Sequence, residues 1–148
     1  MSSTKSSAVV PPTSVPAHPS LRLRGVALFV LLIAEVLLGT ELANVGSPYP
    51  LGLLIAHVGL GLVLMGFSGH TLRLALRGSR AAVKGSAVLT ALGATGAVIS
   101  GFVFLFAGQA PVAELSMEGL GALALLGSLL LIVFGGAQSS ASGPGGSS

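Results

Sequence analysis

Four apolar runs, each about 20 residues long, most constrain what this chain can fold into, because that length crosses a bilayer as a helix. They cover residues 25–45, 51–72, 83–107 and 113–134, with short stretches rich in glycine, proline or arginine between them. Only 7% of the 148 residues are charged and the mean hydropathy is +0.95, whereas a soluble domain needs more charge to cover its surface. The sequence therefore predicts an all-α integral membrane protein, with four transmembrane helices in an up-down bundle.

The two ends of the chain have compositions that do not support a packed core. Residues 1–20 are rich in Ser, Thr and Pro, and residues 137–148 in Gly and Ser. We therefore expect a disordered tail over 1–20, a four-helix transmembrane domain over 21–136 and a flexible tail over 137–148. A cleaved signal peptide is the weaker interpretation, because prolines precede the first apolar run.

The basic residues predict how the bundle is oriented. All seven lie in the N-terminal tail or in or beside the loop between the second and third runs: Lys5, Arg22, Arg24, Arg73, Arg77, Arg80 and Lys84. The loops at 44–50 and 108–113 contain none. The positive-inside rule then places both termini and the middle loop in the cytoplasm, the N-in/C-in orientation, in the cell membrane. In that position the basic residues contact lipid head groups and not nucleic acid.

Five polar or polarisable side chains are predicted in the outer half of this bundle. His57 lies six residues into the second run, about 9 Å along its axis, and Met117 and Glu118 enter from the same side. Glu35 lies near mid-membrane and Glu41 nearer the surface. Ionisable groups at such depth usually face the bundle interior and mark a site. We predict Glu35 as the buried acid of a catalytic site and Glu118 as a further polar member, while Glu41 is expected to reach head groups.

His57 is the candidate ligand of a cofactor. The chain contains no cysteine, which excludes disulfides and thiolate-ligated metals. A neutral imidazole is the usual ligand of membrane b-type haems, and Gly59 and Gly61 leave room beside the ring. We predict that His57 binds haem iron, with Met117 as the second ligand or, in a symmetric dimer, a second His57. A proton carrier and a plain hydrogen-bonded residue are the alternatives, and His70 is expected to be interfacial.

Two further patterns lie in the third run. Small residues at four-residue spacing predict close helix packing: Gly93, Ala97 and Gly101. Three phenylalanines near the outer end predict an interface belt or the wall of a site: Phe102, Phe104 and Phe106.

The stretch around His57 resembles one four-helix half of haem A synthase and, less specifically, small membrane b-type cytochromes. The residues that carry this resemblance are Leu38, Gly39, Gly46, Ser47, Pro50, His57 and Gly61. They correspond to a leucine–glycine motif late in the first helix, a Gly/Pro loop and a haem-ligating histidine early in the second. The resemblance implies a haem-binding role for His57, and an acidic residue of that family's first helix matches Glu35 or Glu41 by location.

The resemblance covers residues 35–66 and, more faintly, 97–127, with two departures. The second histidine of each half is replaced by Met117 or Glu118, and the arginine that often follows the haem histidine is Val58.

The leading functional hypothesis is haem binding in a respiratory membrane, for electron transfer or haem-protein biogenesis. The expected partners are the lipid bilayer and either a second copy of the chain or a larger respiratory complex. Two other classes remain open. One is a non-catalytic membrane subunit or assembly factor, and the other is a proton-coupled carrier that uses Glu35, His57 and Glu118. Whether the protein is an enzyme is left open.

Overall fold

The structure, a computed structural model, describes residues 20–106 and 111–140. This part of the chain forms four helices, α1 (Ser20–Val45), α2 (Leu51–Leu76), α3 (Ala81–Phe106) and α4 (Pro111–Ser140). Each is long and apolar enough to cross a membrane, which confirms the predicted set of four membrane-length helices. Of the tails predicted over residues 1–20 and 137–148, residues 1–19 and 141–148 lie outside the described residues.

Three of the helices extend well beyond the apolar runs from which they were predicted. α1 begins at Ser20 and includes Arg22 and Arg24, and α2 continues past Arg73. α4 continues to Ser140, so residues 137–140, predicted as part of a flexible tail, are helical. Arginine, leucine and alanine all favour helix, so the end of an apolar run does not end the helix.

The turn between α1 and α2 is built by the residues that predicted it. Gly46 has a φ of +69°, and its N–H donates to the carbonyl of Leu42 at 3.2 Å, which ends α1 with a left-handed residue. Pro50 directly precedes α2, and its carbonyl accepts a hydrogen bond from the N–H of Leu54 at 3.0 Å. On the other hairpin α4 begins at Pro111, where a proline loses no helical hydrogen bond.

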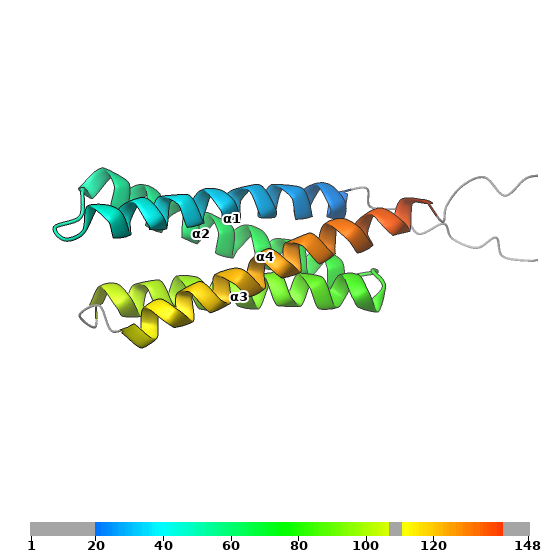
Figure 1. Cartoon of the computed structure of the whole chain (residues 1–148). Helices are drawn as coiled ribbons and strands as arrows, with labels where there is room; N and C mark the ends of the chain where they lie inside the picture. The colour runs from blue at the N-terminus through cyan, green and yellow to red at the C-terminus, as the bar shows by residue number, and fades with distance from the viewer. Residues whose placement is uncertain (1–19, 107–110, 141–148) are drawn as a thin grey trace, which may run out of the picture.

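The four helices form a closed ring in which each packs on two neighbours (Figure 1). Among the described residues the diagonal pairs, α1 with α3 and α2 with α4, have no Cα atoms within 8 Å of each other. We name the two ends by their residues. The loop end holds the 46–50 turn and the start of α4, and the basic end holds the start of α1, residues 77–80 and the end of α4.

The packed core occupies the middle and the basic half of the bundle. Its largest fully buried side chains include Leu28, Leu64, Val83 and Leu131, one from each helix. The buried hydroxyls there donate to carbonyls three or four residues earlier in their own helices, which satisfies them without a partner helix: Ser68, Thr71, Ser86, Thr90 and Ser128. The two hairpins lie closest in this half, where α4 crosses toward α1 (Figure 1).

The α3–α4 interface is the tightest in the bundle, and glycines make it so. A Cβ added at Gly93 would lie 2.6 Å from the backbone nitrogen of Ala124, and one added at Gly127 would lie 2.6 Å from that of Thr90. The predicted packing role of the small-residue pattern is therefore confirmed at Gly93.

Candidate functional site

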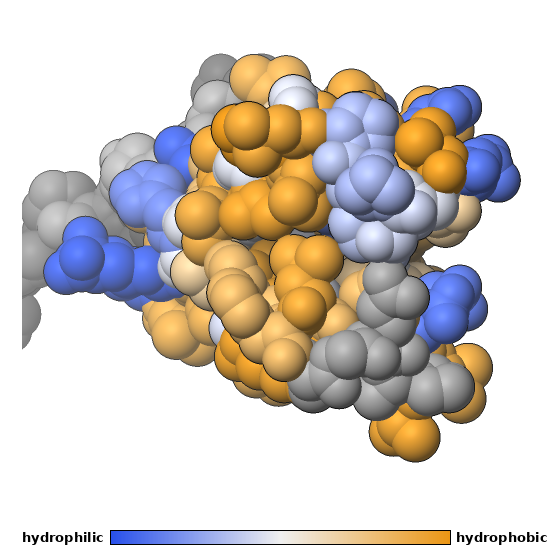
Figure 2. All heavy atoms as spheres, turned by 90° about the vertical axis from the view of Figure 1, so that its left-hand side faces the viewer, coloured by the Kyte–Doolittle hydropathy of each residue, from blue (hydrophilic) through white to orange (hydrophobic). Residues whose placement is uncertain are grey.

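A cavity of about 850 Å³ lies in the loop half of the bundle, and residues from all four helices line it. We call it the chamber. Its wall is mainly apolar, and its volume falls in the range typical of cofactor and small-molecule sites. Phe102 and Phe104 belong to this wall, as one of the two sequence interpretations proposed, whereas Phe106 is 84% exposed. Figure 2 shows the loop end of the molecule, where the surface is largely hydrophobic with a few hydrophilic groups.

Glu35 of α1 and His57 of α2 meet in the chamber wall. Glu35 Oε1 lies 3.2 Å from His57 Nδ1, and the two side chains are only 19% and 21% exposed. The distance is that of an ion pair. His57 Nδ1 and Glu35 Oε2 are both buried without a hydrogen-bond partner among the described residues. Both groups keep the capacity to bind one more polar partner.

Two glycines make room for this pair. A Cβ at Gly39 of α1 would lie 3.2 Å from Cε1 of the His57 ring. A Cβ at Gly61 of α2 would lie 3.1 Å from Glu35 Oε1 and 3.3 Å from Val98 Cγ2. In each helix the polar residue and its glycine are four positions apart and so share a face. Because the helices run antiparallel, each side chain lies against the glycine of the other helix.

The pair leaves one imidazole nitrogen for other chemistry. Since Nδ1 is turned to Glu35, Nε2 is directed away from that carboxyl, on the other side of Cε1. Metal-ligating histidines commonly hold their second nitrogen against a carboxylate, which fixes the ring. A carboxyl in contact with an imidazole can also pass a proton to it. The arrangement suits either a positioned metal ligand or a proton relay.

The polar wall opposite comes from α4. Met117 is half-buried and lines the chamber, with Sδ 3.4 Å from the Cβ position of Gly101. Glu118 also lines it, although the side chain is largely exposed. Glu114, which the sequence interpretation missed, is a third acidic lining residue. Its spacing was a usable signal, because residues three and four apart share a helix face.

Three other predicted residues lie elsewhere. Glu41 is exposed and is not part of the chamber wall. His70 is exposed and lies toward the basic end, away from the chamber. The expectation that Gly59 leaves room beside His57 is wrong, because Gly59 is exposed and nothing lies within 4 Å of its Cβ position. The room beside the imidazole comes from Gly39, whereas Gly61 makes room for the Glu35 carboxyl.

The donor set of the chamber suits haem better than a bare metal ion. The described residues contain no group of three or more His, Asp or Glu side chains able to hold a bare metal ion. A single histidine suits a metal that a macrocycle already holds, as in haem. Met117 belongs to α4, which lies diagonally across the bundle from α2, the helix of His57. The described wall has three glutamates and no lysine or arginine, so haem propionates would have to leave the chamber for water.

In comparisons with known protein families, curated proteins and solved structures, no significant match to the chain was found.

Proposed function

We propose that this is an integral protein of the cell membrane, with its basic end in the cytoplasm. Four helices of membrane length support insertion. The orientation is supported by the basic residues of the described chain, which gather at one end of the bundle. They are Arg22 and Arg24 of α1, Arg73 near the end of α2, Arg77 and Arg80 between α2 and α3, and Lys84 near the start of α3. The chamber then opens into the outer half of the bilayer.

We further propose that the chamber binds haem and that His57 Nε2 is an iron ligand. The observation that carries this proposal is the Glu35–His57 pair in the wall of a cavity of cofactor size. The pair places His57 Nδ1 beside a carboxyl oxygen and leaves Nε2 for a metal. Met117, on the diagonal helix α4, is the candidate for the opposite ligand.

The protein side chains have separate tasks in this proposal. In this proposal Glu35, which contacts His57, acts as a positioning residue in place of the predicted catalytic acid. The apolar wall excludes water and favours a large flat ring over small ions. Haem, when bound, supplies one-electron transfer, so a respiratory redox protein or a haem-protein assembly pathway is the expected partner.

The test is the visible spectrum of the protein, expressed with an ample supply of haem. Wild type is expected to show a Soret band, which His57→Ala abolishes and His70→Ala preserves. His70 is the matched control because it is the same residue type on the same helix, outside the chamber. A colourless wild-type protein would exclude the haem proposal.

A second candidate, a proton-coupled carrier of apolar cations, is favoured by the charges of the chamber. Glu35, Glu114 and Glu118 line it, and no lysine or arginine of the described residues does. Such a wall attracts cations. Binding of tetraphenylphosphonium to the colourless protein, lost in Glu35→Gln, is expected for this function and not for haem binding.

A further inference from the structure

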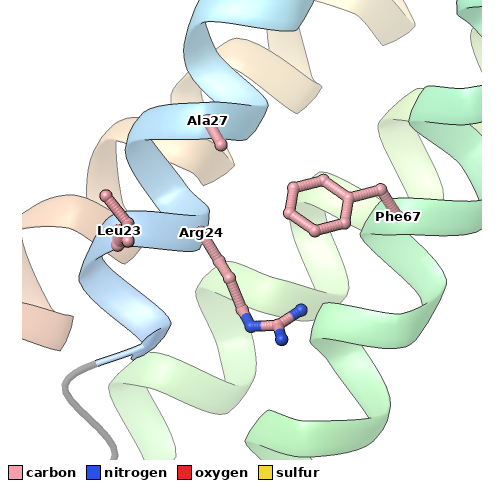
Figure 3. A pocket seen from close by; sticks show the side chains of 4 residues that line it. All are labelled: Leu23, Arg24, Ala27 and Phe67. Atoms are coloured by element: carbon pink, nitrogen blue, oxygen red, sulfur yellow. The ribbon is translucent and has the colours of Figure 1, made fainter.

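A second pocket, of about 260 Å³, lies between α1 and α2 near the basic end. Leu23, Arg24 and Ala27 of α1 and Phe67 of α2 line it (Figure 3). Arg24 extends from α1 toward α2, and its Cζ lies 5.6 Å from the centroid of the Phe67 ring. The contact is a cation–π interaction, and it holds the guanidinium at the edge of an apolar pocket.

The charge of Arg24 has no acidic partner in the described part of the chain. Its Nε is buried without a hydrogen-bond partner, and no ion pair joins it to an acid there. The nearest carboxyl on its own helix, Glu35, is 11 positions away, about 16 Å along the axis. The guanidinium is therefore left without a counter-charge among the described residues, and an anion bound from outside the chain would supply one.

We propose that this pocket binds one anionic phospholipid. The phosphate accepts hydrogen bonds from the Arg24 guanidinium, and the first part of an acyl chain lies against Leu23, Ala27 and Phe67. The proposal depends on the membrane insertion proposed above and is independent of haem.

Three features favour a lipid over a free anion. The walls are apolar apart from Arg24, and Leu23 is 70% exposed on the surface that would face the bilayer. Arg24 is the fifth residue of α1, a depth near that of the head groups. The other basic residues at this end, among them Arg73 and Arg77, raise the local concentration of anionic lipid.

Arginine also fits the chemistry of the head group better than lysine would. Its planar fork donates two parallel hydrogen bonds to phosphate while its face rests on an aromatic ring. Phe67 provides that ring here. Arg22, only two residues earlier, is exposed and lies against Gly136 of α4, so it does not line the pocket.

Native mass spectrometry of the full-length protein in mild detergent tests the proposal, with phosphatidylglycerol, phosphatidylcholine and inorganic phosphate as probes. Wild type is expected to retain one phosphatidylglycerol preferentially. Arg24→Gln should weaken that retention roughly ten-fold, because charge-assisted hydrogen bonds are lost. Arg22→Gln removes the same charge outside the pocket and should stay close to wild type.

Two further variants distinguish a specific lipid-binding pocket from a general attraction of anionic lipid to a basic surface. Phe67→Leu leaves the charge unchanged and should still weaken retention, and Arg24→Lys should give an intermediate value. Phe67→Leu also decides the question if Arg24→Gln fails to accumulate. Equal losses in Arg22→Gln and Arg24→Gln, an unaffected Phe67→Leu, or displacement of the lipid by millimolar phosphate would each overturn the proposal. Soret absorbance should not change in any of these variants.

Discussion

Glu35 Oε1 and His57 Nδ1 lie 3.2 Å apart because each residue has a glycine four positions later in its own helix. Gly39 accommodates the imidazole and Gly61 accommodates the carboxyl. Two antiparallel helices with this spacing bring the two polar side chains to the same level of the bundle. The pair therefore depends on two residues that carry no side chain.

The first prediction concerns Gly61. Gly61→Ala places a methyl group 3.1 Å from Glu35 Oε1 and 3.3 Å from Val98, so the carboxyl must move and the contact with His57 weakens. We expect a loss of about 1–3 kcal/mol of stability, the usual cost of overpacking, seen as a lower melting temperature in detergent.

Gly59 is the matched control for that measurement. It lies on the same helix, but nothing lies within 4 Å of its Cβ position. Gly59→Ala should raise the melting temperature slightly, by about 0.5–1 kcal/mol of added stability, because alanine restricts the unfolded chain. If the two substitutions behaved alike, Gly61 would have no role in accommodating Glu35.

A second prediction concerns charge at Glu35. Glu35→Gln keeps the shape without a charge and should accumulate in the membrane fraction like wild type. Glu35→Lys should not, since a lysine at the centre of a membrane helix costs about 2.5–3.5 kcal/mol on insertion scales. Glu41→Lys is the control, because Glu41 is exposed and outside the chamber wall. Normal accumulation of Glu35→Lys would show that Glu35 faces water.

The third prediction concerns the α3–α4 interface. Gly127→Ala places a Cβ 2.6 Å from both the backbone nitrogen and the hydroxyl of Thr90, a separation that Cβ atoms do not tolerate. The helices must move apart, and we expect a drop of about 1–3 kcal/mol in stability, measured by thermal melting. Gly119→Ala on the same helix has open space at its Cβ and should not destabilise.

The fourth prediction concerns topology. A reporter fused to the C-terminus should be cytoplasmic, and a tag inserted at Ser47 should be reachable from outside, because the basic residues lie at the opposite end from that turn. A C-terminus found outside would contradict the proposed orientation.

The helices were predictable because length and hydropathy are local properties. The turn residues Gly46 and Pro50 marked the boundaries of α1 and α2 at the loop end correctly, whereas α4 begins at Pro111, two residues before the predicted start. At the basic end the prediction stopped too early, since Arg22 and Arg73 end an apolar run without ending a helix. The length of an apolar segment, which hydropathy reports, differs from the length of the helix that contains it.

The depth of the site residues along their helices was predictable from the sequence, but the helix face on which each lies was not. Counting residues placed Glu35, His57, Met117 and Glu118 in the same half of the bundle, and all four line the chamber. Which face each presents depends on how the helices rotate against one another, and apolar runs that are uniform all round carry little information about that rotation. For the same reason Gly59 was assigned to a face that points outward. Glu114, in contrast, was missed although its spacing from Met117 and Glu118 places all three on one helix face.

The helices α2 and α4 stand on opposite corners of the ring, with no Cα atoms within 8 Å of each other. Apart from residues 107–110, which the structure does not describe, a molecule held between His57 and Met117 would thus be the only contact across that diagonal in the loop half, where the packed core does not reach. Without that molecule the two hairpins would be joined mainly at the basic end, and their loop ends could move apart. Binding of a ligand in the chamber should therefore slow the exchange of backbone amide hydrogens in the loop half alone, even if the ligand has no visible absorbance.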